Sequence, residues 1–313
     1  MRALVTGAAG FIGSTLVDEL LASGATVRGV DVFTDYYDVE QKRRNIAAAL
    51  EDPSFALLDA DLRTADVAPL LEDVDVVFHS AAQPGVRSSW ASGFEEYVQQ
   101  NVLATQRLLE AAKTANLARF VYASSSSVYG QAARYPTAER DVPAPTSPYG
   151  VTKLAAEHLV SLYSSNFGVP GVSLRYFTVY GPRQRPDMAI YRLIQAARLD
   201  QSFPLYGNGA HIRDFTFVGD VVRANLLAAE RPLPPGAVFN VAGGGSTSMS
   251  ELIALVGEQV GAPVPLDVLP GQPGDVLQTG GDVSAIDSAL GWRPQTSLEE
   301  GVKAQIAWHE SRG

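Results

Sequence analysis

The chain of 313 residues contains no cysteine, which excludes a disulfide framework and thiolate chemistry. It also lacks any run of about 18 consecutive apolar residues, so the sequence predicts no membrane-spanning helix. Basic residues are scarce, because 24 lysines and arginines stand against 34 acidic residues and give a formal net charge of −10. A surface of that sign repels nucleic acids and anionic lipids, so we expect neither as a partner.

Metal-ligand patterns are missing as well. No His/Asp/Glu spacing in the chain matches a metal site, so we expect no metal cofactor. The first apolar strand is expected from residue 2, which leaves no room for the charged start and apolar core of a secretory signal. With 46% hydrophobic and 19% charged residues, the composition is that of an ordinary soluble globular protein. We therefore expect a cytoplasmic location.

A glycine-rich turn is the most informative feature that is present. Residues 7–13 read Gly-Ala-Ala-Gly-Phe-Ile-Gly and lie between a short apolar strand and an amphipathic helix. In such a unit Gly7 permits the tight turn, Gly10 lets a pyrophosphate approach the backbone, and Gly13 lets the helix pack on the strand. The free N–H groups at the helix start then face the anion. The pattern predicts a dinucleotide site.

Asp31 indicates which dinucleotide is bound. It ends the next predicted strand, where a carboxylate suits the ribose diol of NAD. No basic residue follows closely enough to hold a 2′-phosphate, so we expect NAD as the cofactor. Phe11 and Ile12, inside the glycine-rich turn, are expected to line the same site.

Strand and helix patterns alternate along the first part of the chain. Strands are predicted at 2–6, 26–31, 54–58, 74–78, 119–123 and 171–175, and helices at 11–22, 39–50, 94–116, 149–167 and 187–200. Short apolar strands that alternate with helices predict a doubly wound, parallel α/β sheet of the Rossmann type.

The pattern changes after about residue 180, where proline and glycine become frequent and the elements become short. We expect residues 1–180 to form the NAD-binding domain with the catalytic residues. Residues 181–313 are expected to form mainly a smaller C-terminal substrate-binding lobe, with some segments returning to the first domain. Such a lobe lies over the carboxyl edge of the sheet, where open α/β sheets bind ligands.

Tyr149 and Lys153 are the candidate catalytic pair. They stand four residues apart at the start of a predicted helix, so their side chains share a face. A lysine ammonium and a cationic nicotinamide favour the phenolate and lower the tyrosine pKa from about 10, which makes Tyr149 a general base at neutral pH. An isolated pair of this kind is more often a helix tyrosine followed by a solvated lysine, so the assignment depends on a second element.

That second element is the row of serines that follows the predicted strand at 119–123. Hydroxyls at the carboxyl end of a parallel strand lie where the ligand crevice of such sheets is found. Ser125 is placed there to hydrogen-bond a substrate hydroxyl and to pass its proton to Tyr149. The alternative is an ordinary serine-rich turn.

Together these features resemble the extended short-chain dehydrogenase/reductase family, specifically its NAD-dependent sugar-nucleotide epimerases and dehydratases. The resemblance spans essentially the whole chain. It is carried by the glycine-rich turn, Asp31, Asp61-Leu62, His79-Ser80-Ala81-Ala82, Ser125, Tyr149-x-x-x-Lys153, Arg175-Tyr176-Phe177, Tyr180-Gly181-Pro182 and Arg213-Asp214-Phe215.

The resemblance implies roles for residues that the patterns alone leave unassigned. Asp61 and Leu62 are expected to contact the adenine of NAD, and Ala81 and Ala82 to line the cofactor. It also implies that Lys153 holds the nicotinamide ribose.

Further roles implied by the resemblance concern the nicotinamide end and the substrate. Tyr176 is expected to flank the nicotinamide, and Arg213 to bind the substrate diphosphate. In relatives, the helices predicted at 94–116 and 149–167 pair into a four-helix interface, so we expect a homodimer.

The residues after Ser125 discriminate between reactions within the family. The dehydratases carry an Asp-Glu pair at this point and the sugar-acid decarboxylases carry a Glu, because elimination needs acidic groups there. This chain has Ser126 and Ser127 instead. A 4-keto intermediate forms by hydride transfer to tightly bound NAD. Without acidic groups beside it, its main available reaction is the return of the hydride, which favours 4-epimerisation.

Three segments are similar to those of the UDP-glucuronate 4-epimerases, namely residues 35–39, 85–87 and 185–189. The second of these places Arg87 at the substrate. Because a guanidinium engages a carboxylate bidentately, we expect Arg185 and Thr178 to hold the C5 carboxylate of UDP-glucuronate, with help from Ser126 or Ser127.

Alternatives remain open from the sequence. The sequence Arg183-Gln184 is also found in neutral-sugar relatives, so Arg183 competes with Arg185 as the residue that holds the carboxylate. A 4-epimerase of UDP-glucose/galactose or UDP-xylose is therefore the second hypothesis. A non-catalytic NAD-sensing regulator is the third, although such a protein has no physical need for an intact catalytic set. Asp275 is expected to accept from the uridine ribose or to position Arg213.

Overall fold

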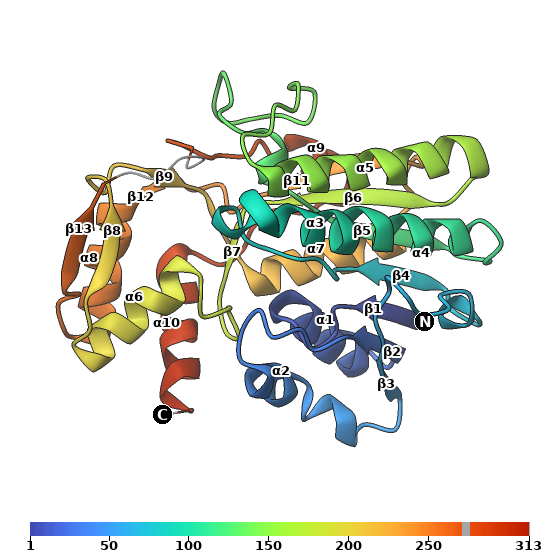
Figure 1. Ribbon diagram of the computed structural model, residues 1–313, viewed down its shortest axis with the longest axis horizontal. Helices are drawn as coiled ribbons and strands as arrows, with labels where there is room; N and C mark the ends of the chain where they lie inside the picture. The colour runs from blue at the N-terminus through green and yellow to red at the C-terminus, as the bar shows by residue number, and fades with distance from the viewer. Residues whose placement is uncertain (271–275, 313) are drawn as a thin grey trace.

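A parallel sheet of seven strands forms the centre of the computed structural model, which describes residues 1–270 and 276–312 (Figure 1). The strand order is β11-β6-β5-β4-β1-β2-β3, and all neighbouring strands are parallel. The strands are β1 (Arg2–Thr6), β2 (Thr26–Asp31), β3 (Phe55–Asp59), β4 (Val76–His79), β5 (Arg119–Ser125), β6 (Gly171–Tyr176) and β11 (Ala237–Val241). The predicted doubly wound α/β fold is therefore confirmed.

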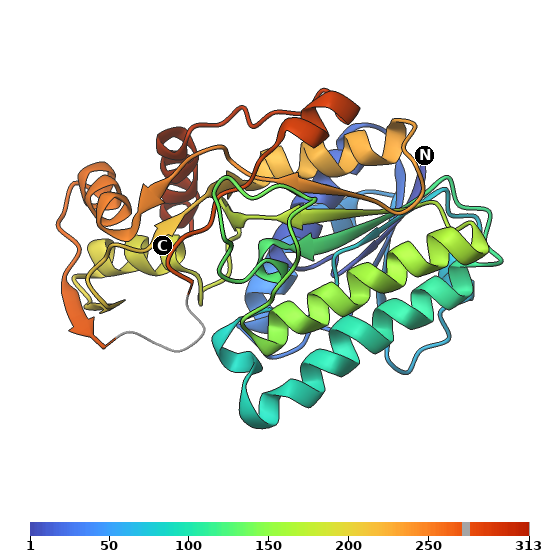
Figure 2. The ribbon, with the colours of Figure 1, turned by 90° about the horizontal axis from the view of Figure 1, so that it is seen from above.

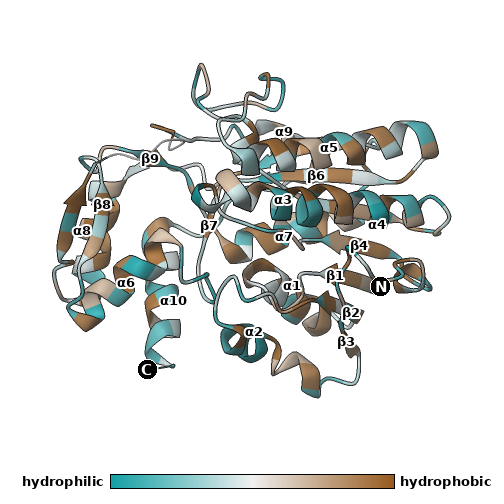
Figure 3. Cartoon of the chain, in the orientation of Figure 1, coloured by the Kyte–Doolittle hydropathy of each residue, from teal (hydrophilic) through white to brown (hydrophobic). Residues whose placement is uncertain are grey.

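The central strands are apolar because both of their faces are covered. Every residue of β4, β5 and β6 is buried. Alternate residues of a strand point to opposite faces, and accordingly Val5 and Phe78 join one core cluster while Leu4 and Val77 join the other. Figure 3 shows the same division, with hydrophobic strands between the layers and a mostly hydrophilic α2 at the edge.

Helices form one layer on each face of the sheet (Figures 1 and 2). One layer contains α4 and α5, which lie side by side, and the other contains α1 and α7, which also contact each other. The helices of this larger domain are α1 (Phe11–Ala22), α2 (Val39–Ile46), α3 (Phe94–Tyr97), α4 (Ala104–Ala112), α5 (Pro148–Phe167), α7 (Val218–Glu230) and α9 (Ser284–Leu290).

The helix predicted at 94–116 is not uniform. Between α3 and α4 the chain makes a π-helical turn at Val98–Leu103. This turn places the amide of Asn101 so that its Oδ1 accepts from the Gln83 N–H at 2.7 Å and its Nδ2 donates to Thr152 Oγ1 at 3.0 Å. The wide turn therefore joins the loop after β4 to the start of α5, a tertiary requirement that periodicity does not reveal.

A smaller lobe carries most of the chain after residue 180, on the left in Figure 1. Its elements are α6 (Ala189–Leu199), α8 (Met249–Val260) and α10 (Leu298–Glu310), with the strand pairs β8 (Phe203–Tyr206) and β13 (Leu266–Leu269), β9 (Ile212–Arg213) and β12 (Thr247–Ser248), and β7 (Thr178–Tyr180) and β10 (Phe215–Phe217). Leu193, Phe203 and Leu252 belong to its core. The elements α7, β11 and α9 return to the large sheet.

None of the helices within the described ranges is long and apolar enough to cross a membrane.

Candidate active site

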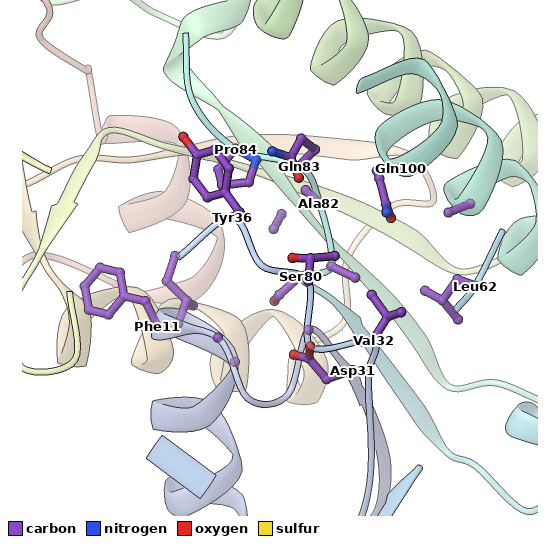
Figure 4. Close-up of a pocket in the computed structure, with 18 of the residues that line it drawn as sticks. Phe11, Asp31, Val32, Tyr36, Leu62, Ser80, Ala82, Gln83, Pro84 and Gln100 are labelled. Carbon is purple, nitrogen blue, oxygen red and sulfur yellow. The ribbon is translucent and has the colours of Figure 1, made fainter. Parts of the chain in front are cut away.

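A cleft with about 1160 Å³ of empty space opens at the carboxyl ends of β1, β2, β4 and β5. The strand order reverses between β1 and β4, which is where open α/β sheets bind ligands. Part of the lining is drawn in Figure 4. Among the predicted cofactor residues, the cleft is lined by Gly7, Gly10, Phe11, Ile12, Gly13, Asp31, Leu62, Ala81, Ala82, Lys153 and Tyr176.

The glycine-rich turn is packed too tightly to accept side chains at two of its positions. Gly7 has a φ of +69°, and a Cβ there would lie 2.9 Å from the backbone nitrogen of Ala81. A Cβ on Gly13 would lie 2.0 Å from the carbonyl oxygen of Gly7. The turn therefore holds β1, the start of α1 and the loop after β4 in close contact, and leaves the helix N-terminus facing the cleft.

Asp31 faces the cleft from the end of β2, close to the glycine-rich turn (Figure 4). Its Oδ2 accepts from the Ala9 N–H at 3.0 Å and its Oδ1 from the Phe33 N–H at 2.8 Å. A carboxylate has about four acceptor positions, so two remain for a diol.

The Asp61 side chain is paired with a neighbouring arginine. Its carboxylate pairs with the guanidinium of Arg63 at 2.7 Å, and hydrogen bonding to that guanidinium holds the pKa of Asp61 below its usual range. Arg63 in turn pairs with Glu96 at 2.9 Å. The neighbours Ala60 and Leu62 line the cleft, whereas the Asp61 side chain is engaged beside it.

Tyr149 lies at the start of α5, where Pro148 is the first helical residue and the Ser147 Oγ caps the helix by accepting from the Gly150 N–H at 3.1 Å. Burial raises the pKa of Tyr149, and a hydrogen bond with Ser125 and the charge of Arg185 oppose that shift. The structure thus brings the phenol and the Ser125 hydroxyl together, as the sequence predicts.

The expected lowering of the Tyr149 pKa is not found in the protein alone, because burial of the phenol outweighs the favourable contacts. Lys153 lines the same cleft with its ammonium 4.5 Å from the ring centre of Tyr122. Burial lowers the pKa of Lys153 to about 7, and the charge of Glu157 opposes this. The ammonium of Lys153 is therefore a buried cation that is itself stabilised by a nearby carboxylate.

A buried polar network lies behind the catalytic residues and includes that carboxylate. Glu157 accepts a hydrogen bond from the Ser124 hydroxyl at 2.6 Å and pairs with Arg175 at 2.6 Å. The Arg175 guanidinium also donates to the hydroxyl of Tyr129 at 2.6 Å, and this hydroxyl donates to Asn240 Oδ1 at 2.8 Å. The network joins α5, β5, β6 and β11 beneath the cleft.

Two further cavities adjoin the catalytic residues on the side of the smaller lobe. One has about 630 Å³ of empty space and is lined by Ser126, Ser127, Thr178 and Arg213, among others. The second, with about 1460 Å³, shares Thr178 and Arg213 with it and adds Arg87. The structure therefore brings these five predicted substrate residues together, while Asp275 lies outside the described residues.

The larger of these two cavities has walls from both lobes. Tyr36, in the loop after β2, lines it together with the cofactor cleft, so the two spaces meet at this side chain. The guanidinium of Arg87 lies over the ring of Tyr206 at 4.3 Å, and that of Arg192 lies over Phe203 at 5.4 Å. Aromatic and cationic groups in one cavity suit a ligand with both a planar ring and phosphates.

Residues 3–242 match the model of the NAD dependent epimerase/dehydratase family. The chain belongs to this family.

Solved structures and a curated relative agree with that match. The UDP-glucuronic acid 4-epimerase from Bacillus cereus, solved with UDP-glucuronic acid and NAD, is 41% identical over 100% of both chains with a TM-score of 0.97. MoeE5, solved with UDP-glucuronic acid and NAD, is 42% identical with a TM-score of 0.91 over 100% of both chains. It was also solved with UDP-glucose and NAD, where the identity is 43% over 100% of this chain and 99% of that one, with a TM-score of 0.90.

The curated relative is an uncharacterized UDP-glucose epimerase, YtcB, from Bacillus subtilis (strain 168). It is 42% identical over 99% of this chain and 98% of its own length. These matches confirm the predicted enzyme class, an NAD-dependent nucleotide-sugar 4-epimerase.

The cleft of this epimerase fits its cofactor, NAD. The close packing at Gly7 and Gly13 leaves room for a pyrophosphate at the start of α1, and Asp31 retains acceptor positions for the adenosine ribose. Tyr176 and Lys153 lie at the other end, where the nicotinamide and its ribose would be held. Within the described part of the chain, no group of three or more histidine or acidic side chains is arranged to hold a metal ion.

Two arginines of the epimerase, two residues apart, have separate surroundings. Arg185 lines the cofactor cleft and pairs with Asp187, whereas Arg183 pairs with Asp18 of α1 at 2.6 Å. Arg183 has a φ of +69°, and this turn in the backbone separates the two side chains. Arg185 lines the cleft that also holds Tyr149, but it does not line the cavity of Ser126 and Ser127.

Several lining residues were not predicted. In the cofactor cleft these include Tyr36, Tyr37 and Lys42, and the buried ammonium of Lys42 donates to the Thr34 carbonyl at 2.6 Å. They fall in or near the segment 35–39, whose similarity to UDP-glucuronate 4-epimerases was recognised from the sequence. Their position in the cofactor cleft was not predicted. Phe203, Tyr206 and His211 line the larger cavity from short elements with no distinctive pattern, and Arg192 lines it from α6, whose helix was predicted although this contact was not.

Proposed function

We propose that the protein catalyses the reversible C4 epimerisation of UDP-glucuronate to UDP-galacturonate. The observation that carries this proposal is the position of Arg185, whose side chain lines the same cleft as Tyr149 and acts electrostatically on that phenol. A cation beside the reacting centre suits a sugar with a carboxylate at C5, because a guanidinium binds a carboxylate through two hydrogen bonds. A neutral hydroxymethyl group needs no such partner.

Hydroxyl groups supply the rest of the proposed carboxylate site. Ser126, Ser127 and Thr178 line the adjoining cavity, and each can donate one hydrogen bond to a carboxylate oxygen. The described residues that line this cavity include no acidic side chain, so the acid groups that elimination needs are not offered there. This supports epimerisation over dehydration of the same intermediate.

The chemistry then follows from the catalytic residues. The Tyr149 phenolate takes the proton of the 4-hydroxyl group, either directly or through the Ser125 hydroxyl, which lies beside the phenol. Lys153 keeps positive charge beside the phenol. When bound, NAD supplies reversible hydride chemistry at C4. The 4-keto sugar turns about its link to the diphosphate before the hydride returns to its other face.

Epimerisation of a neutral UDP-sugar is the second candidate. MoeE5 was solved with UDP-glucose as well as with UDP-glucuronic acid, and the Bacillus subtilis relative is described as a UDP-glucose epimerase. In this chain the charge of Arg185 is already matched by Asp187. A site balanced in this way tolerates an uncharged sugar.

A proton NMR time course with UDP-glucuronate and NAD⁺ tests the proposal. New anomeric signals of UDP-galacturonate that settle at a constant ratio are the expected result. Conversion of UDP-glucose with no change in UDP-glucuronate would favour the second candidate. A UDP-pentose product would mean that the β-keto acid loses CO₂ and that the carboxylate site does not hold it.

Arg185→Ala tests the role of the cation in the same assay. We expect its kcat/KM for UDP-glucuronate to fall about 100-fold, because a carboxylate then lacks its bidentate partner. Any turnover of UDP-glucose should fall far less. Arg183→Ala is the matched control, since Arg183 pairs with Asp18 and lines none of the three cavities described above. Equal effects of the two substitutions on UDP-glucuronate would contradict the assignment.

A further inference from the structure

Arg185 already binds a carboxylate of its own chain. Its Nε donates to Asp187 Oδ1 at 3.0 Å and its Nη2 donates to Oδ2 at 2.9 Å, which is a bidentate pair. The two side chains are 19% and 39% exposed. The carboxylate of Asp187 therefore occupies one edge of the Arg185 guanidinium, the group that is proposed to bind the substrate carboxylate.

The pair lies at the boundary between the two ligand spaces. Arg185 lines the cofactor cleft, Asp187 lines the large substrate cavity, and Tyr36 lines both. The ring of Tyr36 lies 5.9 Å from the guanidinium carbon, and its hydroxyl donates to Asp187 Oδ2 at a long distance of 3.5 Å. Asp187 thus faces the space that the sugar must enter.

The geometry limits what Arg185 offers to a ligand. A guanidinium has five N–H donors, and Asp187 engages the edge formed by Nε and Nη2. The edge formed by Nη1 and Nη2 is left for a second bidentate contact. A substrate carboxylate on that edge meets a cation whose charge is largely balanced, with a like charge close by.

We propose that Asp187 is a specificity-determining residue that sets the preference between anionic and neutral sugars. It fixes the plane of the Arg185 guanidinium, and its negative charge weakens the attraction for a substrate carboxylate while leaving a neutral sugar unaffected. A site with this balance accepts both sugar types, and the uronate gains only from the hydrogen bonds of the remaining edge. The inference rests on the proposed function, since it assigns the carboxylate of UDP-glucuronate to Arg185.

The chain contains a closely matched control. The Arg183–Asp18 pair has an N···O distance of 2.6 Å with side chains 20% and 37% exposed, and neither residue lines the cleft or the two substrate cavities. Asp18→Asn and Asp187→Asn remove the same charge from the same kind of pair. A difference between them therefore reports position and not the loss of an ion pair.

Binding measurements on the NAD-loaded enzyme test the proposal. Dissociation constants for UDP-glucuronate and UDP-glucose are measured by calorimetry for the wild type, Asp187→Asn, Asp187→Glu and Asp18→Asn. We expect Asp187→Asn to shift the ratio of the two constants toward UDP-glucuronate by about fivefold, as for one partly screened charge. The shift should shrink at high ionic strength. Asp187→Glu, which keeps the charge, and Asp18→Asn should retain the wild-type ratio.

An unchanged ratio in Asp187→Asn, or equal weakening of both ligands, would overturn the proposal, because a purely structural role affects both sugars alike. The proposed function is judged separately by turnover of UDP-glucuronate in the wild type. If the wild type converts UDP-glucose alone, the binding ratio still reports whether Asp187 opposes an anionic sugar. The two failures are therefore distinguishable.

Discussion

Lys153 and Glu157 stand one helical turn apart on α5 and are 3% and 2% exposed. A buried ammonium is costly unless it is compensated, and burial lowers the pKa of Lys153 to about 7 despite the opposing charge of Glu157. Glu157 itself pairs with Arg175 and accepts a hydrogen bond from the Ser124 hydroxyl. The charge of Glu157 therefore opposes the loss of the Lys153 proton, and we propose that Glu157 is a positioning residue that acts through Lys153.

Glu157→Gln should move the basic side of the pH–activity profile to lower pH. Removing the negative charge lowers the pKa of Lys153 further, so the ammonium is lost at a pH about one unit below that of the wild type. Activity at pH 8 should then fall about tenfold, while activity near pH 6 falls less. The measurement is kcat/KM from pH 6 to 9 with the preferred UDP-sugar.

Glu157→Asp, which keeps the charge, is the control for this substitution. It should leave the basic side of the profile close to the wild-type position even if the overall rate is lower. A uniform loss of activity in Glu157→Gln, with the profile unmoved, would show that Glu157 has only a packing role. Thermal unfolding of both variants checks that the unpaired Arg175 has not disrupted the fold.

At the scale of elements, the glycine-rich turn makes a prediction that opposes helix propensity. Alanine is favoured over glycine in a helix by about 1 kcal/mol, so Gly13→Ala within α1 would ordinarily stabilise. Here the new Cβ would lie 2.0 Å from the carbonyl oxygen of Gly7, and backbone must move. We expect a loss of about 1–3 kcal/mol in the free energy of unfolding. NAD affinity should fall about tenfold or more, because α1 shifts away from β1.

Gly245→Ala is the control for this element, since nothing lies within 4 Å of a Cβ at that position. Urea unfolding and NAD titration of the two variants give the comparison. If Gly13→Ala matches Gly245→Ala in both measurements, the close packing of α1 on β1 does not restrict the site.

The glycine-rich turn and the alternation of strands and helices were predictable because both are encoded by residues close together in the sequence. Glycines at fixed spacing and apolar runs of strand length need no knowledge of distant partners. β11 was not predicted, since Asn240 interrupts its apolar run. The amide of Asn240 accepts from the Tyr129 hydroxyl and donates to the Thr137 carbonyl at 2.9 Å. A polar residue in a buried strand is explained only by partners far away in the chain.

The candidate site shows the same limit. Tyr149, Lys153 and Ser125 were found because they lie at predicted element ends that the sheet brings to one edge. Arg183 and Arg185 were not separable, because both precede the same helix and differ only in the direction that one residue with positive φ gives to the chain. The direction of Arg183 depends on a tertiary contact with Asp18, whereas Arg185 pairs locally with Asp187.

At the scale of the whole molecule, the active site is shared between the two parts of the fold. The cofactor cleft is built on the large sheet, while the large substrate cavity takes Arg87 from one side and Phe203 and Tyr206 from the smaller lobe. The elements α7 and β11, which follow residue 180, pack on or join the large sheet. The chain after residue 180 therefore contributes to the scaffold and to the lining of the larger cavity, which we propose as the substrate site.

The outer faces of α4 and α5 lead to a prediction about assembly. Figure 2 shows these helices side by side along one side of the molecule. Leu162 and Phe167 of α5 are 51% and 53% exposed, and Leu103, just before α4, is 39% exposed. Exposed apolar side chains on adjacent helices are typical of an interface, so we propose that two copies pair through this face.

Leu162→Arg should therefore convert the protein from a dimer to a monomer, because it places an unpaired charge at an apolar contact between two copies. Sedimentation equilibrium gives the mass directly. Val268→Arg is the control, since Val268 is 66% exposed on β13 in the smaller lobe, far from α5 in Figure 1. We expect the wild type and Val268→Arg to sediment as dimers. A monomeric wild type would exclude the dimer, and a dimeric Leu162→Arg would place the contact elsewhere. A monomeric Leu162→Arg that still binds NAD would assign the interface to α4 and α5.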